Sequence, residues 1–238
     1  MGAADVVPGV SGGTIAFITG IYEKLINSIS QVDVSLIKKI FSGQFTSVWQ
    51  QVNGNFLLSL LIGIAFSVLT LAQLAQYLLE TYPVLLWSFF FGLVVASIIF
   101  IGKQIERWKI IYIVAAVLAI AIAYFITTLT PTSGTDNLLY IFFCGTIAIS
   151  AMILPGISGA FILVLMGAYT TVTKAISDFD LKTIVVFGLG AVTGLLSFSK
   201  LLKWLFGHHR NIVLAILTGF ITGSLNKVWP WKKIIETR

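Results

Sequence analysis

The sequence has little charge, few prolines and a single cysteine. Only 10% of its 238 residues are charged, whereas 58% are hydrophobic, and the mean hydropathy is +1.00. A soluble domain carries roughly 25% charged residues, because most of its surface must stay in contact with water. The shortage of charge therefore excludes a soluble globular domain and a disordered chain, and it predicts an integral membrane protein.

The residues that build disulfides, metal sites and nucleic-acid surfaces are also scarce. Cys144 is the single cysteine, so no disulfide can form within the chain. The two histidines, His208 and His209, have no carboxylates beside them, and the sequence predicts no metal site. Basic residues form no clustered face, so nucleic-acid binding is not expected. The first twenty residues contain no lysine or arginine, so we expect no cleavable signal peptide.

What the sequence does contain is a series of long apolar runs. A membrane-crossing helix needs roughly 20 apolar residues, and these runs lack the alternation of barrel strands. The sequence therefore predicts an all-α integral membrane protein with about six to seven membrane segments. The segments are expected at 8–27, 54–79, 84–102, 110–129, 138–173 (interrupted near its middle), 183–206 and 211–228, with an interfacial stretch at 28–53.

An internal repeat organises these segments. When the chain is aligned with itself, Pro8-Gly9-Val10-Ser11-Gly12 falls on Pro155-Gly156-Ile157-Ser158-Gly159. In a second alignment, with a smaller offset, Gly63 falls on Gly190. We therefore expect a single transmembrane domain over 1–238 that is built from two related halves. The expected division is repeat one at 1–102, a linking span within 103–137 and repeat two at 138–238.

Loop charge indicates which ends face the cytoplasm. Loops 28–53 and 103–109 carry all the lysine and arginine of the first four connections, whereas 80–83 and 130–137 carry none. The first pair is therefore expected on the cytoplasmic side. If 138–173 folds back as a hairpin, the repeats are inverted and the basic tail faces outside. If it crosses once, the repeats are parallel and the tail faces inside. We favour inverted repeats.

Each Pro-Gly element breaks a helix and precedes the start of a new one. The expected breaks are at Pro8, Gly9, Pro155 and Gly156. Backbone groups freed at such a break are tolerated in a membrane only against protein or a water-filled cavity. The new helix starts with unpaired N–H groups and partial positive charge, which suits a phosphate. The residues expected to hold it are Ser11, Gly12, Gly13, Thr14, Ser158 and Gly159. The alternative is that these small residues only permit close helix packing.

Two carboxylates flank the first motif and are candidates for ion coupling. Asp5 either carries a coupling proton or cation or caps a helix. Glu23 either takes part in coupling or forms a solvated ion pair with its neighbour Lys24. We expect no bound cofactor, and we leave coupling to a proton or sodium gradient open.

The motif residues resemble a known prokaryotic family. Residues 2–14 (GAADVVPGVSGGT) and 20–23 (GIYE), with 154–159 (LPGISG), are similar to the polyprenyl-phosphate translocases, formerly known as a membrane domain of unknown function. The resemblance covers nearly the whole chain. It implies inverted repeats with re-entrant helices, and return of undecaprenyl phosphate across the plasma membrane for cell-envelope synthesis. The chain departs from the pattern in its short segment before the first motif. Its Ala160-Phe161, where the first motif has Gly13-Thr14, implies a second site with fewer donors.

Three functions remain open at this point. The leading prediction is a transporter of lipid-flippase type rather than an enzyme, with polyprenyl phosphate and the bilayer as its partners. The first alternative is an ion-coupled transporter of a small soluble anion, which would use the same helix ends. The second is a membrane phosphatase acting on prenyl pyrophosphate. This last reaction needs a nucleophile or base with basic or acidic partners, and none stands near the second motif.

Overall fold

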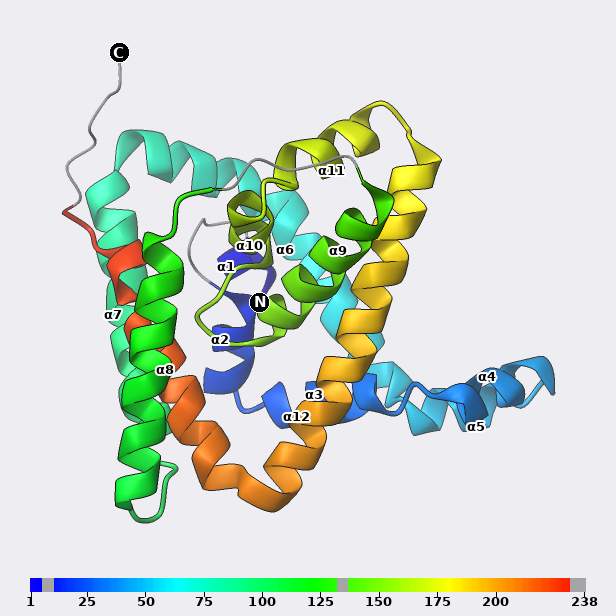
Figure 1. Ribbon diagram of the computed structural model, residues 1–238, viewed down its shortest axis with the longest axis horizontal. Coiled ribbons are helices and arrows are strands. Elements are labelled where there is room, and N and C mark those ends of the chain that lie inside the picture. The colour runs from blue at the N-terminus through cyan, green and yellow to red at the C-terminus, as the bar shows by residue number, and fades with distance from the viewer. Residues whose placement is uncertain (6–10, 132–136, 232–238) are drawn as a thin grey trace.

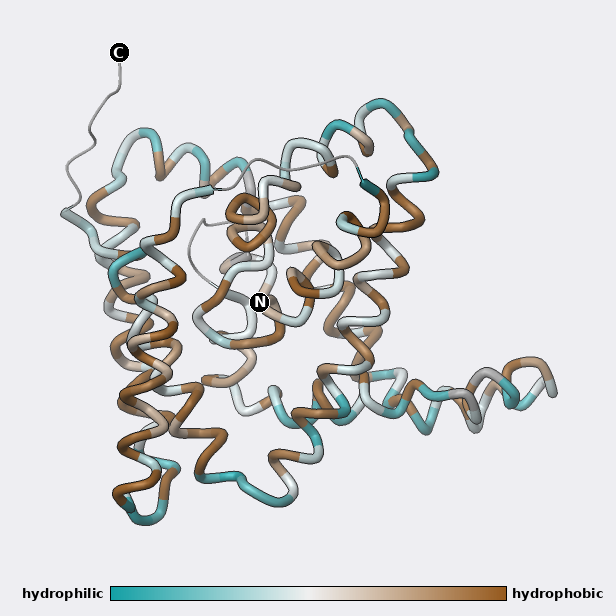
Figure 2. The backbone as a smooth tube through the Cα atoms, in the orientation of Figure 1, coloured by the Kyte–Doolittle hydropathy of each residue, from teal (hydrophilic) through white to brown (hydrophobic). Residues whose placement is uncertain are grey.

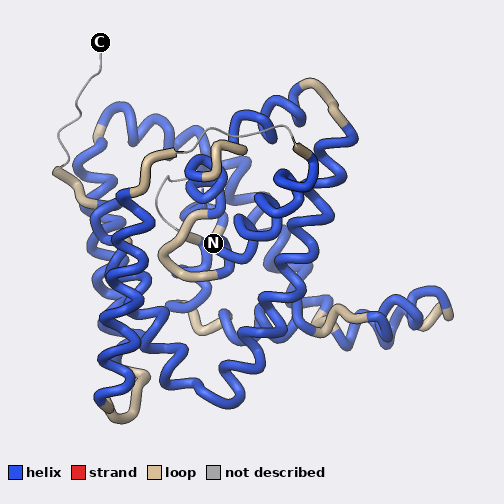
Figure 3. The backbone as a smooth tube through the Cα atoms, viewed as in Figure 1, coloured by secondary structure: helices blue, strands red, loops and turns tan. Residues whose placement is uncertain are grey.

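The computed structural model describes residues 1–5, 11–131 and 137–231 (Figure 1). Within these ranges every regular element is helical, as Figure 3 shows. This confirms the predicted all-α class. Before the middle of the chain the helices are α1 (Gly2–Asp5), α2 (Gly12–Ile18), α3 (Tyr22–Ser30), α4 (Val34–Phe41), α5 (Phe45–Gln51), α6 (Gly54–Thr81) and α7 (Pro83–Gly102). After them come α8 (Ile110–Thr128), α9 (Leu138–Ile153), α10 (Gly159–Leu165), α11 (Tyr169–Ser177), α12 (Leu181–Gly223) and the 3-10 turn η1 (Leu225–Val228).

The longest helices are the membrane-crossing elements. In the described part of the chain, four helices are long and apolar enough to cross a bilayer, namely α6, α7, α8 and α12, and a bent α10–α11 pair makes up to five. Figure 2 shows these helices hydrophobic along most of their length and hydrophilic at the turns that join them. The spans predicted at 54–79, 84–102 and 110–129 are thus confirmed as α6, α7 and α8.

Two of the predicted segments meet in α12. The spans expected at 183–206 and 211–228 join at a kink at His209 (φ −137°, ψ 42°), where two helices follow each other directly, and the end of the second span forms η1. The break expected between these two segments is thus present as a kink. With α12 counted as one span, the described residues hold four spans, or up to five with the α10–α11 pair, instead of the expected six to seven.

The segment expected as one helix at 8–27 is instead divided. It contains α2 and α3, separated by a turn in which Gly20 has a φ of 74°. A glycine in this left-handed conformation is a common helix terminator, because other residues pay a steric penalty there. The same turn recurs after the second motif, where Gly167 (φ 64°) separates α10 from α11.

The helices that follow the two motifs have matching bounds. Both α2 and α10 have seven residues and begin directly after a serine, and both α3 and α11 have nine residues and begin at a tyrosine. The break between α6 and α7 lies at Tyr82 (φ −132°, ψ 52°), which the second alignment places on the kink at His209. Between the two pairs of matching helices, the first half has residues 31–53, which include α4 and α5, whereas the second half has only the short link 178–180. These extra residues in the first half explain why the second alignment has a smaller offset than the first.

The corresponding long helices run in opposite directions. In Figure 1, α6 runs from the lower right toward the top, whereas the first part of α12 runs from the top right downward. Similarly, α7 descends at the left and the second part of α12 ascends beside it. In this view, the two long helices of α12 thus run opposite to α6 and α7, their counterparts in the second alignment.

Small residues bring α12 close to its neighbours. Gly190 and Gly194 lie against the backbone of α9, and Thr146 donates a hydrogen bond to the carbonyl oxygen of Gly190 at 3.0 Å. Beyond the kink, Gly219 and Gly223 lie against the backbone of α8. Both pairs have the small-xxx-small spacing that lets membrane helices pack closely.

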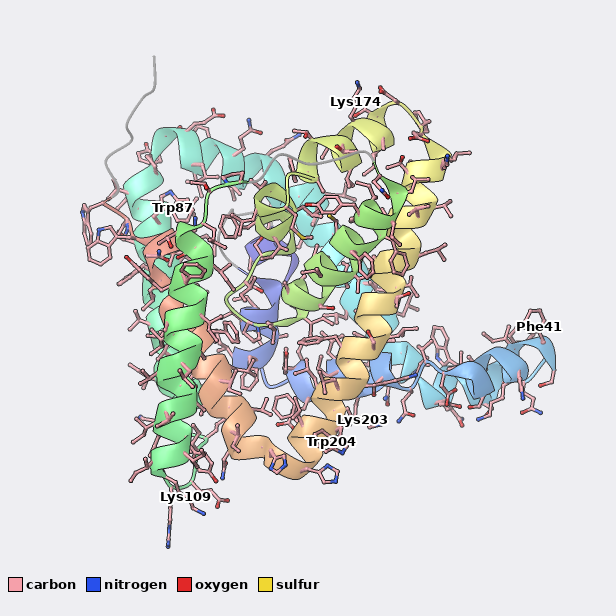
Figure 4. The ribbon with its side chains drawn as sticks, viewed as in Figure 1. Phe41, Trp87, Lys109, Lys174, Lys203 and Trp204 are labelled. Atoms are coloured by element: carbon pink, nitrogen blue, oxygen red, sulfur yellow. The ribbon has the colours of Figure 1, made fainter. Side chains whose placement is uncertain are left out.

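The stretch predicted to be interfacial forms a side arm. Helices α4 and α5 project from the body, and Figure 4 shows Phe41 at the tip. Phe41 is 88% exposed, and Phe45 and Trp49 are exposed as well. Asp33 starts α4 by accepting hydrogen bonds from the N–H of Leu36 and the hydroxyl of Ser35. These bonds lower the pKa of its carboxyl group.

Candidate functional site

The beginning of α2, which follows the first motif, meets the second Pro-Gly motif in the interior of the helical bundle. The N–H of Gly156 donates a hydrogen bond to Oγ1 of Thr14 at 3.1 Å, although the two residues are far apart in sequence. Near it, the hydroxyl of Tyr22 donates to the carbonyl oxygen of Ile153 at 3.1 Å. These contacts join the beginning of α2 and α3 to the break after α9. Pro8 and Gly9 lie outside the described residues, whereas Pro155 and Gly156 form the break between α9 and α10.

The first motif provides its own hydrogen-bond acceptors. Ser11 is the N-cap of α2, and its Oγ accepts the N–H of Gly13 at 3.2 Å. The N–H of Thr14 bonds to the carbonyl oxygen of Ser11 at 3.0 Å. The prediction that these N–H groups are unpaired was therefore wrong. Ser11, Gly12, Gly13 and Thr14 are all buried, and a buried N–H group that lacks a ligand must find an acceptor within the protein.

Glycine at position 13 allows a close approach. A methyl group placed on Gly13 would lie 3.1 Å from the carbonyl oxygen of Ile153, at the end of α9, so α2 or α9 would have to shift by a few tenths of an ångström. This close contact agrees with the packing alternative for Gly13, and it is compatible with a binding role because a bare backbone also admits a ligand.

The second motif has an N-cap serine with the same extended backbone as Ser11, but the side chain of this serine makes different contacts. Gly156 has a φ of 87°, and a methyl group there would lie 2.9 Å from Cα of Ile221. Ser158 occupies the N-cap position of α10 with extended backbone, but among the described residues its side chain caps no N–H group. Ser158 is half-buried, whereas Gly159 is buried against α9. The two motifs are thus unequal in capping and exposure.

Helices α9 and α10 form a hairpin. Gly159 lies next to Ala148, where a methyl group on it would be 2.8 Å from the carbonyl oxygen of Ala148. At the other end, the hydroxyl of Tyr140 donates to the carbonyl oxygen of Met166. The chain therefore returns along α9, with both ends of the hairpin side by side. Helix α11 then turns away from α10 by 110°.

A lysine near the second motif was not singled out from the sequence. Nζ of Lys227 lies 4.1 Å from the centre of the Phe161 ring, which belongs to the first turn of α10. Next to it, Nδ2 of Asn226 donates to Oγ1 of Thr127 at 2.7 Å. The sequence did hold a signal for Lys227, because an ionisable residue at the end of an apolar span is a candidate functional residue. Lys227 was passed over because it directly precedes the basic, aromatic tail and was grouped with it.

Of the two carboxylates proposed for ion coupling, the structure describes the side chain of Glu23 but not that of Asp5. Asp5 is the last residue of α1, and its side chain is outside what the structure describes. Glu23 forms an ion pair with Arg210 at 3.2 Å, and Arg210 also donates to Gln104 at 3.4 Å. The predicted pairing of Glu23 with Lys24 was therefore wrong. Nζ of Lys24 instead lies 4.7 Å from the centre of the Phe56 ring.

The Glu23–Arg210 pair is expected to contribute little to stability. Its side chains are 50% and 47% exposed, and such surface pairs contribute about 0–1 kcal/mol. Arg210→Gln should therefore lower the free energy of unfolding by at most about 1 kcal/mol, as measured by thermal unfolding in detergent. Lys24→Gln serves as the matched control. A loss several times larger in Arg210→Gln would show that the pair holds the α12 kink in place.

No metal site accompanies these residues. Across the described ranges, no three histidine, cysteine, aspartate or glutamate side chains gather in a way that could hold a metal ion. The polar groups at the meeting point of the motifs are backbone N–H groups, hydroxyl groups, the carbonyl oxygens of Ser11 and Ile153, which are already paired, and, further out, a lysine. This set suits an anion of the phosphate kind better than a cation.

Comparison with known proteins places the chain in a family. A family model described as undecaprenyl phosphate translocase-like matches residues 1–238. The chain belongs to this family. Membership confirms the resemblance of the motif residues and agrees with a multi-pass membrane transporter of a prokaryote. No solved structure matches the chain.

Two curated relatives support this assignment to the undecaprenyl phosphate translocase-like family. A polyprenyl-phosphate transporter of Vibrio cholerae serotype O1 is 47% identical over 238 residues, which cover 100% of this chain and 77% of the relative. A polyprenyl-phosphate transporter of Staphylococcus aureus is 34% identical over 249 residues, which cover 97% of this chain and 83% of the relative.

Proposed function

We propose that the protein carries a polyprenyl phosphate across the membrane and binds its phosphate where the two motifs meet. Family membership and the names of the two relatives support the lipid substrate. The hydrogen bond between Thr14 and Gly156 is the observation that carries the location, because it brings both predicted helix starts to one point. The lipid would serve as a carrier that is recycled in cell-envelope synthesis.

The hydroxyl groups of the first motif stand where phosphate oxygens would bind. Oγ of Ser11 accepts the N–H of Gly13, and Oγ1 of Thr14 accepts the N–H of Gly156. A charged phosphate oxygen is a stronger acceptor than a hydroxyl group. On binding, the phosphate would replace both oxygens, and the two hydroxyl groups would then donate to it. In the absence of a phosphate, the same groups keep the N–H groups paired.

The second motif, with its half-buried Ser158, supplies the remaining contacts in this proposal. Ser158 would donate its hydroxyl group, and Gly159 would offer its backbone at the beginning of α10. The ammonium group of Lys227, near the first turn of α10, would add positive charge. An ionised head group in an apolar core costs, in the idealised limit, tens of kcal/mol. Shielding that group is therefore the main task of the protein.

We place the two motifs on re-entrant hairpins of two inverted repeats, 1–102 and 138–238, joined by 103–137. The opposite directions of corresponding helices support this arrangement (Figure 1), as does the return of α10 along α9. Exchanging the conformations of two inverted halves would open the site alternately to each side. Asp5 and Glu23 stay the candidates for coupling transport to a proton or sodium gradient.

Binding measurements with two serine variants test this proposal. Purified protein should bind farnesyl phosphate much more tightly than inorganic phosphate or farnesol. Ser11→Ala and Ser158→Ala should each weaken that binding roughly tenfold, because each removes a hydrogen bond to a charged group. Ser177→Ala is the matched control, since that hydroxyl group bonds only to its own helix, at Thr173.

The other outcomes separate the alternatives. Equal affinity for inorganic phosphate would favour a transporter of a small soluble anion. Release of phosphate from farnesyl pyrophosphate would favour the phosphatase. Unchanged binding in both serine variants would contradict the site at the motifs.

A further inference from the structure

An apolar cavity lies beside the first motif. It has a volume of about 260 Å³ and lies between α2, α3, α9 and α12. Its walls are formed mainly by Leu25, Ile26, Ile29, Ile149, Ile153 and Leu195. Such walls offer an ion or a phosphate no partner, because every polar group buried there would lose its contacts with water. They suit a hydrocarbon chain.

The cavity is continuous with the proposed phosphate site. Gly13 lines it, and the N–H of the same residue bonds to Oγ of Ser11. The ring of Tyr22 also lines it, while the hydroxyl of Tyr22 bonds to Ile153 between the motifs. At the rim stands Met152, which is 45% exposed. The cavity therefore leads from the surface of the bundle to the first turn of α2.

The volume corresponds to a short length of hydrocarbon. A dry apolar cavity of roughly 150 Å³ holds a six-carbon molecule such as benzene. By that measure, about 260 Å³ would hold on the order of ten carbons, or two five-carbon isoprene units. A long prenyl chain would thus place only its first units here and pass out over the rim into the bilayer.

We infer that this cavity binds the isoprene units nearest the phosphate of the substrate. The inference rests on the proposed function, which places the phosphate at Gly13, and it goes further by adding a second binding determinant. The prenyl chain would not be left wholly to the lipid. The protein would recognise the junction of phosphate and prenyl chain, so that neither part alone would bind well.

Filling the cavity tests the inference. Ile149→Phe and Leu195→Phe each place extra bulk in it from a different helix. Both should weaken the binding of farnesyl phosphate, which has three isoprene units, about tenfold, because several apolar groups lose their burial. Dimethylallyl phosphate, which has one unit, should be affected much less. Binding is measured by titration calorimetry of the purified protein.

Control variants distinguish a loss of prenyl binding from a general loss of stability. Ile147→Phe on α9 and Leu189→Phe on α12 are matched controls, because these side chains are 46% and 58% exposed on the same helices. Leu195→Ala, which cannot collide with a neighbour, should also weaken farnesyl phosphate binding, by a few-fold. The unfolding temperature of each variant is recorded alongside.

Three results would overturn the inference. In the first, the filled variants bind farnesyl phosphate as wild type does. In the second, they lose dimethylallyl phosphate to the same extent, which would indicate damage to the phosphate site. In the third, wild-type protein binds neither prenyl phosphate, and then the proposed function itself fails.

Discussion

Gly190→Ala is expected to destabilise the protein by about 3 kcal/mol or more, the upper range for overpacking a tight interface. The added methyl group would collide with the carbonyl oxygen and Cα of Phe142, which belong to the backbone of α9. A side chain can move aside, but a helix backbone can yield only if α9 and α12 separate. Separation would also break the hydrogen bond from Thr146 to Gly190. Reversible unfolding in detergent measures the loss.

Gly188→Ala is the control for this prediction. Gly188 lies on the opposite face of α12, where a methyl group would meet no described heavy atom within 4 Å. Alanine is a better helix former than glycine by about 1 kcal/mol, so this variant should be neutral or slightly more stable. Gly63, the counterpart of Gly190 in the first half of the chain, also faces open space and should tolerate alanine. Equal effects at positions 188 and 190 would contradict the packing described for α9 and α12.

Thr14→Val is expected to reduce both stability and substrate binding. The change preserves the shape of the buried Thr14 side chain but leaves the partly buried N–H of Gly156 without its acceptor. An unsatisfied buried donor costs about 1–3 kcal/mol. Since Thr14 is also proposed to contact the phosphate, farnesyl phosphate binding and transport into proteoliposomes should fall by roughly tenfold or more. Thr14→Ser keeps the hydroxyl group and should retain most of both properties.

A second buried threonine, Thr218, provides the control for Thr14→Val. Thr218 is 8% exposed, and its hydroxyl group donates only within α12, to the carbonyl oxygen of Leu214 at 2.7 Å. Thr218→Val should therefore leave farnesyl phosphate binding unchanged. If Thr14→Val and Thr218→Val reduced binding equally, the contact between the motifs would have no special role.

Local features of the site were predictable because local chemistry determines them. A serine after Pro-Gly, followed by glycine, gives the same helix start at Ser11 and at Ser158, with extended backbone in both places. Glycine at 20 and at 167 ends the following helix in the same left-handed turn. The repeat in the sequence thus translated directly into α2, α3, α10 and α11.

Contacts between distant segments were not predictable in the same way. Nothing near Glu23 in sequence indicates Arg210 as its partner, because the pair forms only when α3 packs beside the kink of α12. The bond from Gly156 to Thr14 likewise depends on how the two halves dock.

The kink in α12 has a mechanical consequence. Its counterpart in the first half, at Tyr82, is followed by Pro83, which has no N–H to donate, and α6 and α7 are separate helices. At the corresponding place α12 has Arg210, yet His209 has non-helical φ and ψ and the helix is broken there as well. Each half of the chain therefore has a joint between its two long helices. A change of angle at either joint would move one long helix relative to the next without bending either of them.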